Sequence, residues 1–87
     1  MDFANHPGMR FRVGDVVMHP RKHHLIFLRS NANSLTTNWK TCPVWGRTST
    51  AIIIEVKIDM KSIGEIMFKL VTPNGTGWTD WWNVTHS

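Results

Sequence analysis

The chain has 87 residues, of which 41% are hydrophobic and 18% are charged, and its formal net charge is +4 with the histidines neutral. This length suits one domain with one small core, so it excludes two-domain enzymes and large cofactor-binding folds. The composition is that of a folded protein, and we predict a single domain over residues 1–87.

Alternating apolar residues predict strands, and no helix longer than about two turns is expected because no long window has apolar side chains at helical spacing. Residues 9–18 are predicted to form the first strand. Gly14 indicates a bulge in this strand, so that Phe11 and Val13 share one face before it and Val16 and Met18 share that face after it. Residues 19–49 form a long insertion that is expected to hold at least one extra hairpin, since a structureless loop of that length is unusual in so small a domain.

The remaining strands are predicted within residues 50–87. Over residues 52–59 the alternation predicts a half-buried strand that directs these side chains to the core: Ile52, Ile54, Val56 and Ile58. The next strand directs a second set inward: Ile66, Phe68 and Leu70. These two strands are expected to form a hairpin. The turn sequence TPNG at residues 72–75 predicts another hairpin, into a strand at residues 77–79.

Several segments resemble SH3-like small β-barrels. The opening strand of this family resembles FRVGDVV at residues 11–17. Its other strands resemble four later segments: residues 50–56, 66–71, 74–79 and 82–84. In this order the segments are similar to short SH3-like proteins that tailed phages encode. The resemblance covers about half of the chain. The sequence departs from the family pattern at residues 19–49, where similar proteins have a short loop. It also departs at Val84, which stands in place of leucine.

The resemblance implies an all-β fold, a small SH3-like barrel of about five antiparallel strands with the long insertion after the first strand. It also implies a phage origin, with the protein in the cytoplasm of a host cell or in a virion. Barrels of this type bind proteins or nucleic acids, so the fold does not by itself choose the function.

Tryptophans and an outer apolar patch favour a protein-binding function. Three of the five tryptophans lie in residues 78–82. Trp78 is expected inside the barrel and Trp82 across its open end. Trp81 is adjacent to Trp82, so on an extended chain the two side chains point to opposite sides and one of them lies at the surface or rim. Exposed tryptophan is typical of binding hot spots.

The hairpin of residues 52–59 and 66–70 has one face that points away from the core. This outer face is expected to carry apolar residues among charged ones. The predicted protein-binding residues are Ile53, Met67, Val71 and Trp81. Either the insertion folds back and covers this patch with residues such as Leu25 and Phe27, or the patch is an interface with a protein partner or a second copy. The favoured function is a non-enzymatic binding or assembly module, either a virion component or a modulator of a host protein.

The alternative function is a nucleic-acid-binding barrel, because the first half of the chain is basic. Residues 1–47 hold seven Lys and Arg and two acids, whereas residues 48–87 hold three basic and four acidic residues. The candidate residues are Arg10, Arg12, Arg21, Lys22, Arg29, Trp39, Lys40, Trp45 and Arg47. Because they are spread along the chain, we expect binding no tighter than ~10⁻⁴ to 10⁻⁶ M at physiological salt.

No catalytic, metal or cofactor site is predicted, and neither is a small-molecule substrate. The six carboxylates form no pair suited to acid and base roles, and no nucleophile or phosphate-loop motif occurs. A possible metal cluster of His19, His23, His24 and Cys42 has the spacing of no standard zinc site. The longest apolar run, residues 51–54, is far short of the ~18 residues of a membrane span, and the first residues do not have the pattern of a signal peptide. We therefore expect no membrane partner.

Overall fold

A computed structural model describes residues 6–19, 25–30, 39–46, 49–58 and 66–86 of the chain. Its strands are β1 (Val16–Met18), β2 (Leu25–Phe27), β3 (Val44–Gly46), β4 (Thr50–Ile58), β5 (Ile66–Thr72), β6 (Gly75–Asp80) and β7 (Thr85–His86). Three 3₁₀ helices accompany them: η2 (Pro7–Arg10), η3 (Trp39–Thr41) and η4 (Trp81–Asn83). The all-β prediction is confirmed. No helix within these ranges exceeds four residues, so none of them is long enough to cross a membrane.

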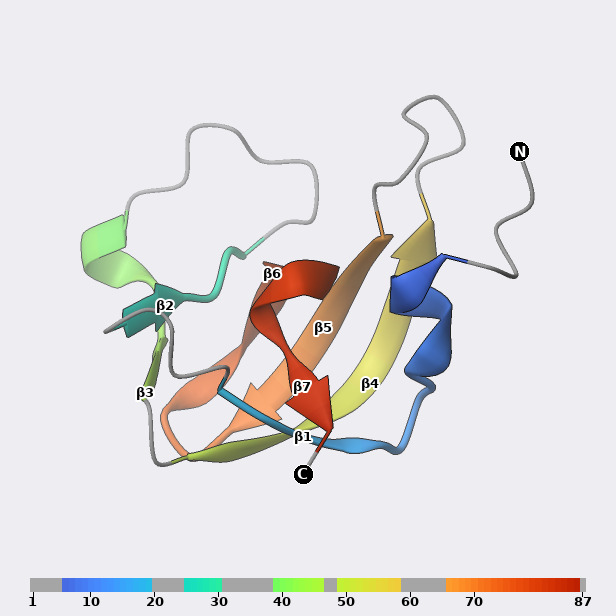
Figure 1. Ribbon diagram of the computed structural model, residues 1–87. Coiled ribbons are helices and arrows are strands. Elements are labelled where there is room, and N and C mark those ends of the chain that lie inside the picture. Colours follow the sequence, from blue (N-terminus) through green and yellow to red (C-terminus); the bar gives the residue numbers. More distant parts are fainter. Residues whose placement is uncertain (1–5, 20–24, 31–38, 47–48, 59–65, 87) are drawn as a thin grey trace.

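The strands pair into two antiparallel sheets (Figure 1). Five of them form a curved sheet in the order β6-β5-β4-β1-β7, and β2 pairs with β3 in a second sheet. The described strands do not close into a barrel. The order of the larger sheet places β1 and β7 side by side, with Val17 opposite His86.

Strands β4, β5 and β6 form the two hairpins that the sequence predicts. At the second turn Gly75 has a φ of +140°, a conformation that favours glycine. Thr72 fixes this turn, since its hydroxyl accepts a hydrogen bond from the Asn74 amide (3.2 Å) and donates one to the Gly75 carbonyl (2.8 Å). The predicted inward side chains of β5 are all fully buried: Ile66, Phe68 and Leu70.

Strand β4 contains a β-bulge that the sequence does not predict. Ile53 pairs with Leu70 and Glu55 pairs with Lys69, so Ile54 is an extra residue between two consecutive pairs. An extra residue interrupts the alternation of side chains along the strand. On one side of the bulge, every side chain therefore lies on the face opposite to the one that an unbroken alternation would give.

The predicted core face of β4 is therefore wrong in the first half of the strand. Ile53 is fully buried, whereas Ile52 and Ile54 are 45% and 42% exposed. Beyond the bulge the prediction holds, since Val56 and Ile58 pack against the core. The outer face of the sheet thus carries isoleucines that the sequence analysis assigned to the core.

The first strand is shorter than the predicted residues 9–18. Helix η2 occupies the beginning of this segment, and a turn in which Gly14 has a φ of +96° follows it in place of a bulge. Strand β1 begins only at Val16. Val17 faces the core and is fully buried, whereas Val16 is exposed and Met18 is half-buried. Phe11 packs against the core while Val13 is exposed, so the predicted common face of these residues is wrong.

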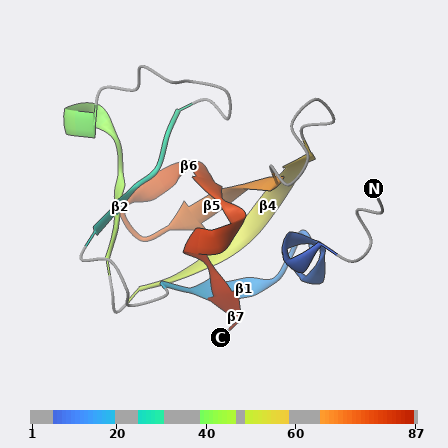
Figure 2. The same ribbon diagram turned by 45° about the horizontal axis from the view of Figure 1, so that its top comes forward.

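The insertion holds the extra hairpin that the sequence predicts, formed by β2 and β3. Ile26, Leu28 and Trp45 belong to the core, so this described part of the insertion packs on the inner face of the larger sheet. After β2 the chain runs along β6, where Arg29 and Trp78 exchange two backbone hydrogen bonds of 2.7 and 2.9 Å. Figure 2 shows this hairpin at one side of the larger sheet and η2 at the other, with η4 between them.

One core joins the two sheets. Its buried members are Val17, Ile26, Leu28, Trp45, Ala51, Ile53, Ile66, Phe68, Leu70 and Val84. Full burial of one large apolar side chain contributes about 1.5–3 kcal/mol. Phe11 and Trp81 pack against the edge of this core. These two aromatic side chains connect the core to the candidate site.

Trp78 lies outside this core, contrary to the prediction. It pairs with Lys69 across the two strands and forms a separate small cluster with Met67. Beside the cluster, the guanidinium of Arg29 forms an ion pair with the carboxylate of Asp80 at 3.0 Å. Met67 is only 4% exposed.

Candidate functional site

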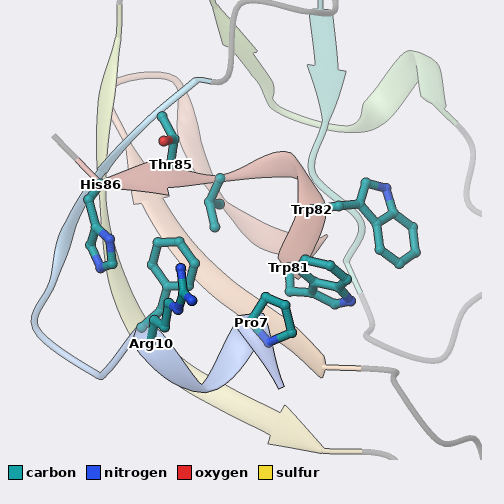
Figure 3. A pocket seen from close by; sticks show the side chains of 8 residues that line it. Pro7, Arg10, Trp81, Trp82, Thr85 and His86 are labelled. Atoms are coloured by element: carbon teal, nitrogen blue, oxygen red, sulfur yellow. The ribbon is translucent and has the colours of Figure 1, made fainter. Parts of the chain in front are cut away.

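Two hollows flank the exposed side chain of Trp82, and together they are the Trp82 cleft. The first has a volume of about 400 Å³ and is lined by Pro7, Arg10, Phe11, Trp81, Trp82, Val84, Thr85 and His86 (Figure 3). The second has a volume of about 350 Å³ and is lined by Leu25, Ile26, Phe27, Trp82 and Asn83. Trp82 borders both hollows and is 54% exposed.

Helix η4 presents Trp82 to solvent. A single 3₁₀ turn directs successive side chains to different sides, so Trp81 turns toward the core while Trp82 turns away from it. At the end of the helix, Asn83 donates a hydrogen bond from Nδ2 to the hydroxyl oxygen of Thr79 at 3.1 Å. This bond ties η4 to β6, so the exposed indole stands on an anchored element.

Trp81 forms one wall of the first hollow. Its ring meets that of His6 edge to face, with centroids 4.8 Å apart, and that of Trp82 in the same manner at 5.8 Å. Such contacts contribute about 0.5–1.5 kcal/mol each beyond the area that they bury. Gly8 allows η2 to approach this closely, because a Cβ at this position would lie 3.1 Å from the Cβ of Trp81.

Phe11 and His86 form the opposite wall. Their rings are stacked, with centroids 4.2 Å apart and an angle of 24° between the planes. The Nε2 atom of His86 lies 3.7 Å from a carboxylate oxygen of Asp15, a contact that becomes an ion pair when the imidazole is protonated. Figure 3 shows Arg10 on the same side of the hollow as His86, with the two tryptophans on the other side. The first hollow therefore combines aromatic walls with a cationic rim.

The structure separates the four predicted protein-binding residues. Ile53 is fully buried and Met67 is nearly so, and neither offers a surface to a partner. Val71 is 40% exposed on the outer face of the sheet. Trp81 is half-buried and lines the cleft, but its neighbour Trp82 is the exposed tryptophan, which reverses the predicted roles of the two.

The described nucleic-acid-binding candidates lie on different elements, and Arg10 is the one among them that lines the cleft. Arg10 lines the cleft, Arg12 is exposed in the turn before β1, and Lys40 is exposed in η3. Arg29 is held in its ion pair with Asp80. The described cations therefore form no continuous basic track at the cleft.

Trp45 is fully buried, contrary to its predicted role in base stacking. Its indole N–H donates a hydrogen bond to the carbonyl oxygen of Ser49 at 3.0 Å, and the ring of His19 meets it edge to face. Trp39 begins η3. The remaining candidates lie outside the described residues: Arg21, Lys22 and Arg47.

Two of the histidines considered for a metal cluster, His23 and His24, also lie outside the described residues. His19 is buried and Cys42 is half-buried. Within the described part of the chain, no three His, Cys, Asp or Glu side chains gather in a way that could hold a metal ion.

Most of the cleft is not apparent from the sequence. One signal was available, because two adjacent tryptophans cannot both face a core from an extended chain. The choice between Trp81 and Trp82 is made by η4 and by His6, which is distant in sequence. The other walls come from η2 and β2, and no local pattern connects these segments.

No protein-family model, curated protein or solved structure matches this chain. Its own fold and site define it as an all-β domain with an aromatic cleft around one exposed tryptophan.

Proposed function

We propose that this protein is a non-enzymatic binding module that holds a segment of a partner protein in the Trp82 cleft. The observation that carries the proposal is the exposed indole of Trp82, which stands between two hollows on an anchored helix. Tryptophan is enriched among the residues that dominate binding energy at protein interfaces. The two hollows provide space for partner side chains on both sides of the ring.

The composition of the cleft supports a peptide as the ligand. Its lining mixes aromatic and aliphatic side chains with polar ones, among them Arg10, Thr85, His86 and Asn83. A peptide fits such a mixed lining, because its side chains can bury apolar surface while its backbone bonds to the polar groups. The positive charge of Arg10 favours a peptide with an acidic group beside its apolar anchor.

A peptide library tests this proposal. Short random peptides are selected on the wild-type protein, and the affinity of each selected peptide is then measured on Trp82→Ala. We expect peptides with apolar anchors, and we expect Trp82→Ala to weaken them about thirtyfold or more, which corresponds to about 2 kcal/mol. Because Trp82 is largely exposed, the variant should stay folded, and its melting temperature should fall only by the few degrees that the lost ring contact with Trp81 accounts for.

The matched control is Val13→Ala. Val13 is 63% exposed and lines neither hollow, so its replacement removes exposed apolar surface without touching the cleft. Its peptide affinities should equal those of the wild type. Selected peptides that bind Trp82→Ala as tightly as the wild type would contradict the proposal.

The alternative is a nucleic-acid-binding module, and one observation favours it: Arg10 and Trp82 line the same hollow. Base stacking on tryptophan beside a cation is a common mode of single-strand binding. A titration with oligothymidine at increasing salt tests it. We expect a dissociation constant no lower than ~10⁻⁴ to 10⁻⁶ M at physiological salt, because few phosphates can be neutralised. Nanomolar binding that Trp82→Ala abolishes would favour the alternative over the peptide.

For the architecture, we propose an SH3-like arrangement in which β1, β4, β5, β6 and β7 are the barrel strands. The adjacency of β1 and β7 supports it, since it brings strands from near the two ends of the sequence together in the sheet that also holds β4, β5 and β6. The resemblance to SH3-like phage proteins supports a phage origin, with the protein acting either as a virion component or as a modulator of a host protein.

A further inference from the structure

The outer face of the larger sheet carries an exposed apolar row that the Trp82 cleft does not use. Val16 in β1 pairs with Ile52 in β4, which in turn pairs with Val71 in β5. Directly paired residues share one face of a sheet. These three side chains are 40–45% exposed, and the bulged Ile54 beside them is 42% exposed. We call these four residues the outer row.

Opposite charges lie next to the outer row on the same face. Glu55 in β4 is exposed and pairs directly with Lys69 in β5. The same two strands therefore carry an apolar pair, Ile52 with Val71, and an oppositely charged pair on one face. A second copy of the chain carries the same two pairs, so the two faces can be complementary.

We propose that the outer face is a dimer interface, in which a second copy of the chain packs face to face about a two-fold axis. The axis runs parallel to β4 and β5 and between them. Such an axis exchanges the two strands, so residues that are paired within one sheet face each other between the copies. Ile52 then meets the partner's Val71, and Glu55 meets the partner's Lys69. Each contact occurs twice.

The geometry of sheet packing is compatible with this arrangement. Two sheets pack face to face at a distance of about 10 Å, with their strands rotated by about 30° because each sheet is twisted. This rotation moves facing residues of the two copies out of alignment, and it does so least for residues that lie next to the two-fold axis. The pairs of β4 and β5 lie next to the axis, and Val16 lies one strand further out.

The charges favour a second copy over a nucleic acid. A phosphate backbone attracts cations and is repelled by carboxylates, and Glu55 lies beside the outer row. A second copy of this chain places a lysine against Glu55 and a glutamate against Lys69, so each charge meets one of opposite sign. The dimer also leaves the Trp82 cleft available, because none of the outer row lines either hollow. This inference is therefore independent of the proposed function.

Sedimentation equilibrium tests the dimer. Stable complexes bury about 800 Å² on each partner, and the outer row is a small surface by that standard, so we expect a dissociation constant of about 10 to 1000 µM. Ile52→Glu should raise this constant at least about tenfold, because it places two carboxylates against the apolar row. The control Val13→Glu adds the same charge at an exposed valine in the turn before β1, outside the outer row, and should leave the constant unchanged.

Mixing two charge-reversal variants tests the axis itself. Glu55→Lys gives a face with two cations, and Lys69→Glu gives a face with two anions. Each variant alone should dimerise about three- to tenfold more weakly than the wild type, because like charges meet twice. In an equimolar mixture both contacts become attractive, so a heterodimer of near wild-type affinity should form. If a substitution weakened the dimer only by disturbing its own chain, mixing the two variants would not restore the affinity.

Three results would each overturn this proposal. The first is a monomer at protein concentrations up to about 1 mM. The second is a dimer that persists unchanged in Ile52→Glu. The third is a mixture of the two charge variants that associates no better than either variant alone, which would exclude the proposed axis.

Discussion

Ile53→Asp is expected to unfold the domain, whereas Ile52→Asp is expected to leave it folded. Ile53 is fully buried, and Ile52 is exposed on the outer face. Aspartate at the buried position removes apolar contacts and places an unpaired charge in the core, which together cost about 4 kcal/mol or more. A domain of this size is stabilised by only about 5–15 kcal/mol. At the exposed position the cost is about 1 kcal/mol. Urea denaturation followed by circular dichroism measures both.

Phe68→Asp is the control for a buried charge, because Phe68 is fully buried in the neighbouring strand. It should unfold the domain as Ile53→Asp does. Met67→Glu should also destabilise, since Met67 is packed against Trp78 on the other face. The opposite ranking of the two isoleucines, with Ile52→Asp unfolded and Ile53→Asp folded, would show that β4 has an unbroken alternation and no bulge.

The second large effect is expected at Gly77, where two parts of the chain touch. A methyl group on Gly77 would lie 2.6 Å from Leu28 Cβ and 2.9 Å from the carbonyl oxygen of Arg29. Both atoms belong to or adjoin the backbone, so the segment must move, and its two backbone hydrogen bonds with Trp78 must weaken. We expect Gly77→Ala to lower the free energy of unfolding by about 3 kcal/mol, as measured by urea denaturation.

Gly46→Ala is the matched control for this change. Gly46 also lies in a strand, its φ is not positive, and the nearest atom to an added Cβ is Ser49 Oγ at 4.0 Å. The free energy of unfolding should therefore change by less than about 1 kcal/mol. If the free energy of unfolding fell equally in the two variants, Leu28 and Arg29 would not approach β6 as closely as they do in this structure.

The hairpins were predictable because their signals are local. Alternation fixes the inward side of β5, where Lys69 separates the apolar positions, and TPNG fixes the second turn. The face of β4 was not predictable, because Ile52, Ile53 and Ile54 are identical and an isoleucine can occupy either face. Only the pairing with β5 shows which of them is the extra residue.

The cleft was less predictable than the fold because it depends on contacts between distant segments. The sequence shows that Trp81 and Trp82 are adjacent, and therefore that one of them is exposed. It does not show that η2 places His6 against Trp81, or that β2 borders the other side of Trp82. Both arrangements depend on the core, which draws residues from both sheets.

The position of β1 between β4 and β7 determines how the chain can fold. Val17 lies opposite Ala51 on one side and opposite His86 on the other, so this strand is held by partners far along the chain. The hairpins of β4, β5 and β6 connect consecutive segments, and they need much shorter loops to close. Distant pairings form slowly because loop closure costs entropy before any contact is gained. We therefore expect the hairpins to form first, and the Trp82 cleft, which needs η2, η4 and β7 together, to assemble after them.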